Sequence, residues 1–90
     1  MNTKDVLTTA LLLTGGARAT QHGDKRLNHK NIADLWSAYF RLPFTEHDVA
    51  MAMVLVKVAR TRTGQPNADD YIDMAGYAAI ASELSDQEGR

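Results

Sequence analysis

One segment constrains the fold of this chain more than any other: every residue from 49 to 59 except Lys57 is apolar. A helix at the surface of a globular protein keeps a polar face. We therefore expect a helix this continuously apolar to be the central element, surrounded by neighbours. Thr45 followed three residues later by Asp48 is a variant of the capping box, which places the start of the helix at about Glu46.

Two helices are expected before this segment. Residues 4–14 place apolar side chains at the intervals of an amphipathic helix, and Gly15-Gly16 follows as a natural stop. Asp24 is the expected N-cap of the second helix, which should end at about Arg41 because Pro43 forces the residue before it out of the helical region. Six apolar side chains share a broad face of this second helix: Leu27, Ile32, Leu35, Trp36, Tyr39 and Phe40.

A fourth helix is expected after a segment of turn-forming residues at 61–68. It opens at Asp69 or Asp70 and runs to about Leu84, and the polar residues 85–90 are expected to fray. Another backbone could approach this helix closely, because five of its residues are small: Ala75, Gly76, Ala78, Ala79 and Ala81.

Together these elements predict one all-α domain over residues 1–90, with four helices and with helices three and four as an antiparallel hairpin. So small a domain buries only about 60–65% of its unfolded surface, and with so apolar a third helix this favours a homo-oligomer. The absence of cysteine excludes disulfides and thiolate zinc sites. A net charge of −1 and the lack of a long apolar segment argue against a nucleic-acid or membrane partner.

The hairpin brings a set of charged residues to one end. Lys57 and Arg60 stand near the end of helix three, and Asp70 and Asp73 near the start of helix four, each pair at the three-residue spacing of one helical face. Tyr77 extends this face by one turn. One interpretation is an interhelical network of Lys57–Asp73 and Arg60–Asp70 salt bridges. The other is a pocket with cations for phosphate and carboxylates for a ribose or base.

A second group of candidate ligand-binding residues surrounds the start of helix two. His22, Asp24 and Arg26 flank a glycine, and free backbone N–H groups at a helix start can hold a phosphate. The alternative is a turn with an N-cap, and the histidine spacing does not favour metal ligation. Trp36 is expected in the core or stacked on a base. No serine lies in a nucleophile motif, so no catalytic residue is predicted.

Several blocks of the sequence together resemble a family of small, uncharacterised proteins encoded by tailed phages and prophages. The resemblance covers residues 17–84, and its blocks are His22-Gly23-Asp24, Ile32-Ala33-Asp34-Leu35-Trp36-Ser37-Ala38-Tyr39, Asp48-Val49-Ala50, Lys57-Val58-Ala59-Arg60 and the residues from Asp70 to Ala79. It implies a phage origin and a location in the bacterial host cytoplasm, without an assigned activity.

Asp70-Tyr71-Ile72-Asp73 is also similar to the second acidic motif of the all-α nucleoside triphosphate pyrophosphatases, the MazG and dUTPase-like group. In that group four carboxylates from two motifs hold magnesium at the nucleotide phosphates. The first motif is missing here, and two carboxylates beside two cations make a poor magnesium site. We therefore expect no cofactor, and magnesium only if the chain is a pyrophosphatase.

Three functions follow as hypotheses. The first is a nucleotide-binding protein that sequesters a nucleotide second messenger of anti-phage immunity, by analogy with other small phage proteins. The second is a MazG-like pyrophosphohydrolase whose magnesium cluster would combine five carboxylates: Asp34, Glu46, Asp48, Asp70 and Asp73. The third is an adaptor that binds and inhibits a host protein through exposed helical faces.

Overall fold

The computed structural model describes residues 1–15 and 24–87. Within these ranges the chain forms α-helices and no strand, which confirms the predicted all-α class. The four helices are α1 (Thr3–Gly15), α3 (Lys25–Phe40), α4 (Glu46–Arg60) and α5 (Ala68–Gln87). None of them is long and apolar enough to cross a membrane.

Local signals set most helix ends where they were predicted. The Thr45 side chain accepts a hydrogen bond from the Asp48 backbone N–H, and the Asp48 carboxylate accepts one from the Thr45 N–H, so the capping box is complete. Asp24 caps α3, its carboxylate accepting from the Arg26 N–H at 2.8 Å. The prediction for the last helix was wrong at its end, because α5 continues to Gln87 and residues 85–87 are helical rather than frayed.

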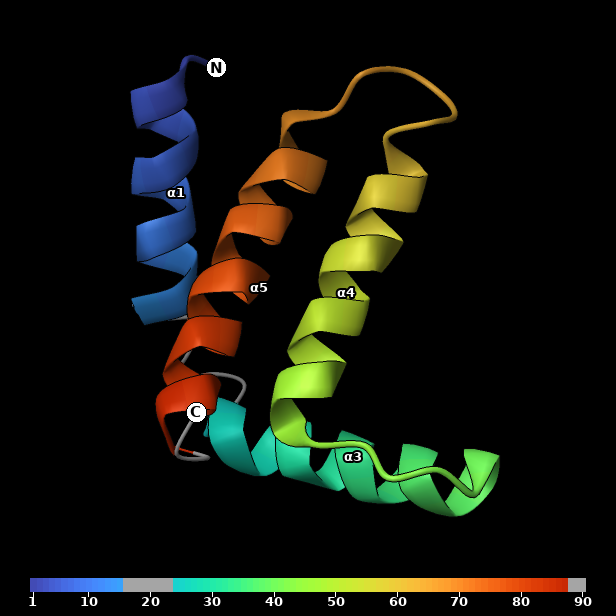
Figure 1. The fold of residues 1–90 in the computed structure, drawn as a ribbon. Coiled ribbons are helices and arrows are strands. Elements are labelled where there is room, and N and C mark those ends of the chain that lie inside the picture. Colours follow the sequence, from blue (N-terminus) through green and yellow to red (C-terminus); the bar gives the residue numbers. More distant parts are fainter. Residues whose placement is uncertain (16–23, 88–90) are drawn as a thin grey trace.

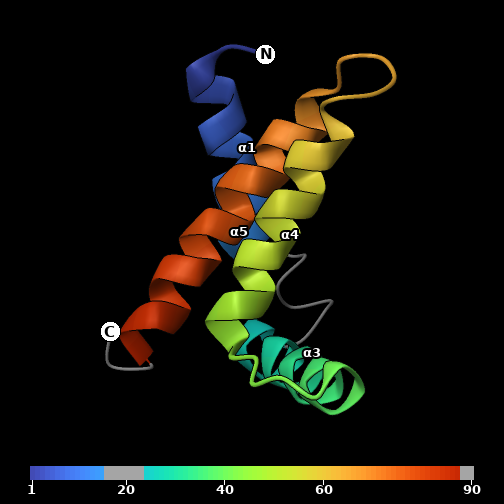
Figure 2. The same cartoon turned by 45° about the vertical axis from the view of Figure 1, so that its right-hand side comes forward.

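α5 lies between α1 and α4 (Figure 1). α4 runs antiparallel along one side of α5, as predicted, and α1 packs on another side. α3 crosses beneath them, against the first turns of α4, as the turned view in Figure 2 also shows. A Cβ placed on Gly76 would lie 3.1 Å from the Thr14 methyl group, so the close approach predicted for the small-residue helix occurs against α1.

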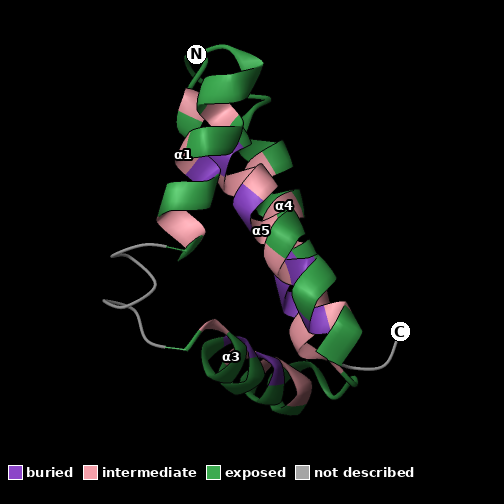
Figure 3. Cartoon of the chain, turned by 90° about the vertical axis from the view of Figure 1, so that its left-hand side faces the viewer, coloured by how far each residue is buried: buried purple, intermediate pink, exposed green. Residues whose placement is uncertain are grey.

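Small side chains dominate the core. Figure 3 shows the buried residues gathered mainly along the contacts of α5 with α1 and α4. The buried apolar residues among those described are Ala10, Ala33, Val49, Ala50, Ile72, Ala81 and Leu84, four of them alanine. Alanine contributes few methylene groups, so this core provides little apolar burial.

The expectation that helix three is surrounded by neighbours was wrong. Among the described helices, only α5 and α3 pack extensively against α4, and four of its large apolar side chains are between 42% and 67% exposed: Met51, Leu55, Val56 and Val58. Ala50 is buried against Ala81 and Leu84 of α5, and Val49 beside it is also fully buried, whereas these four side chains lie where no described residue covers α4. A continuous apolar run does not specify how many elements cover it.

Candidate functional site

The predicted charged quartet forms two interhelical ion pairs. The Lys57 Nζ atom lies 3.1 Å from Asp73 Oδ2, and the Arg60 Nε atom lies 3.2 Å from Asp70 Oδ1. Both pairs follow from the antiparallel packing of α4 and α5, which sets the last turns of one helix beside the first turns of the next. The salt-bridge interpretation is thereby confirmed.

The two pairs differ in burial. The Lys57 side chain is 13% exposed and that of Asp73 30%, whereas Arg60 is 57% exposed over an Asp70 side chain that is only 8% exposed. Each cation therefore contacts a carboxylate of the same chain, and the quartet is electrically neutral. A phosphate entering here would have to compete with Asp73 for the Lys57 ammonium and would lie beside the Asp70 carboxylate.

The remaining predicted binding residues are not brought to this quartet. Tyr77 packs its ring edge against His29 of α3, with ring centroids 6.4 Å apart. Trp36 contacts Phe44, just before α4, so it is separated from Lys57 by about 17 Å of helix. Asp24 and Arg26 are exposed at the start of α3, and His22 lies outside the described residues.

No metal site is formed by the described residues. They contain no group of three or more histidine, aspartate or glutamate side chains that could hold an ion, so the five carboxylates of the pyrophosphohydrolase hypothesis do not converge. Asp48 serves the capping box, and Asp34 bonds to Lys30 at 2.8 Å, a hydrogen bond that raises the pKa of Lys30. The His29 Nδ1 atom donates to the Lys25 carbonyl at 2.6 Å.

Sequence reasoning missed an aromatic cluster at the end of α3, which we call the aromatic corner: Trp36, Tyr39, Phe40 and Phe44. Its rings meet in pairs with centroids 5.0 to 5.9 Å apart. Of the six aromatic side chains of the chain, four lie here. The sequence could have indicated this cluster, because three of its residues lie just before the Leu42-Pro43 step and Phe44 lies just after it. A turn at this step brings Phe44 back to the end of α3.

The aromatic corner is largely open to solvent. Tyr39 is 82% exposed and Phe40 54%, and beside them Leu35 and Leu42 are 69% and 59% exposed. Of the six apolar side chains that share the predicted face of helix two, Leu27, Leu35, Tyr39 and Phe40 are more than half exposed, so this face is covered only in part.

Backbone contacts fix the shape of this corner. Ser37 Oγ accepts a hydrogen bond from the Phe44 N–H at 2.9 Å and donates to the Phe44 carbonyl at 3.4 Å, which ties the turn to α3. Arg41, in the turn, has a φ of 57°, the only positive φ of a non-glycine residue in the part of the chain that is described. The hydroxyl that sequence reasoning excluded as a nucleophile is therefore engaged in holding Phe44.

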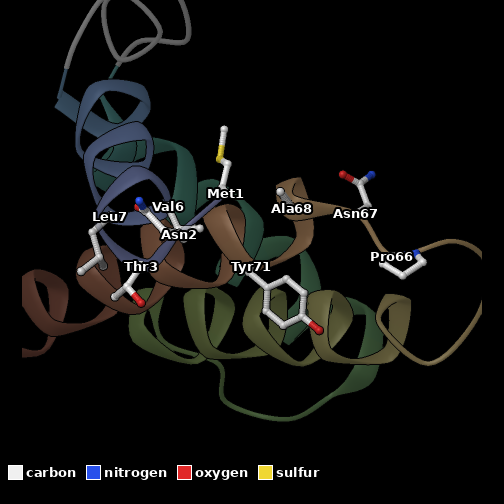
Figure 4. Close-up of a pocket in the computed structure, with 9 residues that line it drawn as sticks. All are labelled: Met1, Asn2, Thr3, Val6, Leu7, Pro66, Asn67, Ala68 and Tyr71. Atoms are coloured by element: carbon white, nitrogen blue, oxygen red, sulfur yellow. The ribbon is translucent and has the colours of Figure 1, made fainter.

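A separate shallow groove lies between the start of α1 and the start of α5, with a volume of about 700 Å³ (Figure 4). Its lining contains no charged side chain and none of the predicted binding residues: Met1, Asn2, Thr3, Val6, Leu7, Pro66, Asn67, Ala68 and Tyr71. A phosphate would find no cationic side chain here.

The fold and these contacts define a small all-α domain with interhelical ion pairs and exposed apolar surfaces. Residues 5–85 match a family model described as a domain of unknown function (DUF6378), and the chain belongs to this family. It is 42% identical over 80 residues to the Gene 55 protein of Mycobacterium phage L5, in an alignment that covers 88% of this chain and 51% of the relative.

A second relative, the Gene 55 protein of Mycobacterium phage D29, is 34% identical over 84 residues, covering 93% of this chain and 56% of the relative. The chain thus spans about half the length of the curated relatives it matches. No solved structure matches it. The predicted membership in a phage-protein family without an assigned activity is confirmed, and the resemblance to the pyrophosphatases finds no support in these comparisons.

Proposed function

We propose that this domain is a protein-binding module that holds a partner protein at the aromatic corner, in line with the adaptor hypothesis. The observation that carries the proposal is the exposure of Tyr39 and Phe40 at a site where four of six aromatic residues gather. Tyr, Trp and Phe are enriched at the cores of protein interfaces, where they supply large contact areas. Burying these aromatic rings in place of alanines would stabilise the fold more, so their exposure is not explained by folding.

The rigidity of the corner supports the same proposal. Ser37 fixes Phe44 by two backbone hydrogen bonds, and the edge of the Phe44 ring meets Trp36 at 5.8 Å. A surface already held in its binding shape loses less conformational entropy on association. Arg41 adds a backbone conformation that costs about 1 kcal/mol for a non-glycine residue, the kind of local strain that gathers at functional sites.

Site-specific photo-crosslinking in bacteria tests the proposal. A photoreactive phenylalanine analogue in place of Tyr39 should attach a discrete host or phage protein, because this side chain is the most exposed of the corner. The same analogue in place of Ala79, which is exposed on α5, is the matched control. Phe40→Asp should abolish the adduct at position 39, and Arg60→Ala should leave it unchanged. Identical adducts from both positions, or none from position 39, would refute the proposal.

A second candidate is the nucleotide-sequestering function, favoured by one observation: the Arg60 side chain is 57% exposed at the end of the hairpin while its partner Asp70 is buried. An exposed guanidinium can bind a phosphate bidentately without leaving its buried carboxylate unpaired. Calorimetry against cyclic dinucleotides and ADP-ribose derivatives tests this. Binding by the wild type that is lost in Arg60→Ala and kept in Arg26→Ala would support it, and the absence of heat with every ligand would remove it.

A further inference from the structure

We propose that two copies of this chain pack antiparallel through the outer face of α4, defined as Met51, Leu55 and Val58. These three side chains are 43%, 67% and 42% exposed. They lie on the side of α4 turned away from α5, since Leu55 stands two residues, or about 200° around the helix, from the Lys57 that pairs with α5. This surface is distinct from the aromatic corner, and the inference goes beyond the proposed function.

The spacing on this face is that of a helix–helix seam. Starting at Asp48, the outer-face residues of α4 follow at intervals of three, four and three, and Arg62, in the turn just past the end of α4, comes four residues after Val58. Alternating intervals of three and four keep side chains in one straight row, which is the pattern by which two helices pack side by side. The row reads acidic, then apolar over three residues, then basic.

The charges at its two ends select a second copy in the antiparallel orientation. Two such rows packed antiparallel place Asp48 of one copy beside Arg62 of the other, twice, with the apolar residues between. A parallel arrangement would set like charges against each other at both ends, which costs free energy. A two-fold interface of this kind requires a self-complementary surface, and the row from Asp48 to Arg62 has that property.

Burial of the outer face would cover the apolar side of α4 that no element of the described chain covers.

Cysteine cross-linking tests the proposal cleanly, because the natural sequence contains no cysteine. Leu55→Cys places one thiol at the centre of the row, near the two-fold axis. A short bismaleimide should therefore join most of the Leu55→Cys chains into covalent dimers. Ala79→Cys, exposed on α5, is the control and should remain largely uncoupled.

Light scattering of the unmodified chain supplies the second measurement. We expect a particle of twice the 9.9 kDa chain mass, reduced to a single chain in Leu55→Glu with an unchanged helical circular dichroism spectrum. Arg62→Glu should weaken association at least tenfold, and Arg26→Glu, the same charge change on α3, should not. Three results would each overturn the proposal. They are a wild-type chain that is monomeric at about 100 µM, efficient coupling of Ala79→Cys, and a dimer that persists in Leu55→Glu.

Discussion

The Lys57 ammonium contacts the Asp73 carboxylate at 3.1 Å in a setting where only 13% of the lysine side chain is exposed. The two residues belong to different helices that meet only because α4 and α5 pack antiparallel. A lysine within an otherwise apolar helical run is thus neutralised by the neighbouring helix rather than by solvent.

Loss of either partner of this pair should destabilise the fold. We expect Asp73→Ala to lower the free energy of unfolding by about 1–3 kcal/mol, because it leaves a half-buried ammonium without its acceptor. Removing the cation as well, in the double variant Lys57→Met with Asp73→Ala, should cost less than Asp73→Ala alone. Urea titration followed by circular dichroism measures both.

The surface pair Lys30–Asp34 provides the control for this experiment. It is shorter, at 2.8 Å, but both side chains are more than half exposed. Asp34→Ala should therefore leave the free energy of unfolding nearly unchanged. Equal losses in Asp34→Ala and Asp73→Ala would show that burial does not govern the Lys57 pair.

The contact between α1 and α5 can be tested at Gly76. Alanine at a helix interior is favoured over glycine by about 0.5–1 kcal/mol, but here the added Cβ would lie 3.1 Å from the Thr14 methyl group. We expect Gly76→Ala to be nearly neutral in the wild-type background. It should become stabilising by about 0.5–1 kcal/mol in a Thr14→Ser background, because serine lacks that methyl group.

Thr14→Ser retains the hydroxyl that donates to the Ala10 carbonyl at 2.8 Å, so the background change is confined to the methyl group. Thermal unfolding of the four proteins of this cycle gives the coupling between the two sites. If the effects of Gly76→Ala and Thr14→Ser on stability simply add, α1 does not approach Gly76 as closely as in the structure.

Removal of the Ser37 hydroxyl should loosen the aromatic corner. Ser37→Ala deletes both hydrogen bonds to the Phe44 backbone, and we expect a loss of about 1 kcal/mol in stability. Trp36 is the single tryptophan of the chain and contacts Phe44, so its fluorescence emission should shift to longer wavelength in this variant. Ser82→Ala, on the exposed side of α5, should change neither quantity. An unaltered Trp36 emission spectrum in Ser37→Ala would contradict the proposal that Ser37 holds Phe44 against Trp36.

Substitution of Arg41 by glycine should separate stability from binding. Glycine adopts a φ of 57° without the steric cost of a Cβ, so Arg41→Gly should raise the free energy of unfolding by about 1 kcal/mol. Arg26→Gly, within α3 and without a positive φ, is the control and should not stabilise. If the strained turn serves partner recognition, the yield of the adduct formed at position 39 should decline in Arg41→Gly despite the higher stability. If chemical denaturation shows no increase in the free energy of unfolding, the turn at Arg41 is not strained.

Local chemistry explains why much of the fold was predictable. The capping box at Thr45, the N-cap at Asp24 and the restriction imposed by Pro43 act within a few residues, so the helix starts at 25 and 46 and the end near 40 could be predicted from neighbours in sequence. The ion pairs of Lys57 and Arg60 were also predictable, because a short connection between helices leaves little freedom in how they pack.

The helices, their hairpin and the ion pairs between α4 and α5 therefore follow from residues that are close along the chain. Which apolar faces are covered follows instead from packing between segments that are distant along it. Burial depends on how many neighbours reach a face, and that number follows from the crossing of α3 beneath α4, not from hydrophobic periodicity. This crossing left Tyr39, Phe40 and Leu55 exposed, and with them the surfaces at which this chain is proposed to meet its partners.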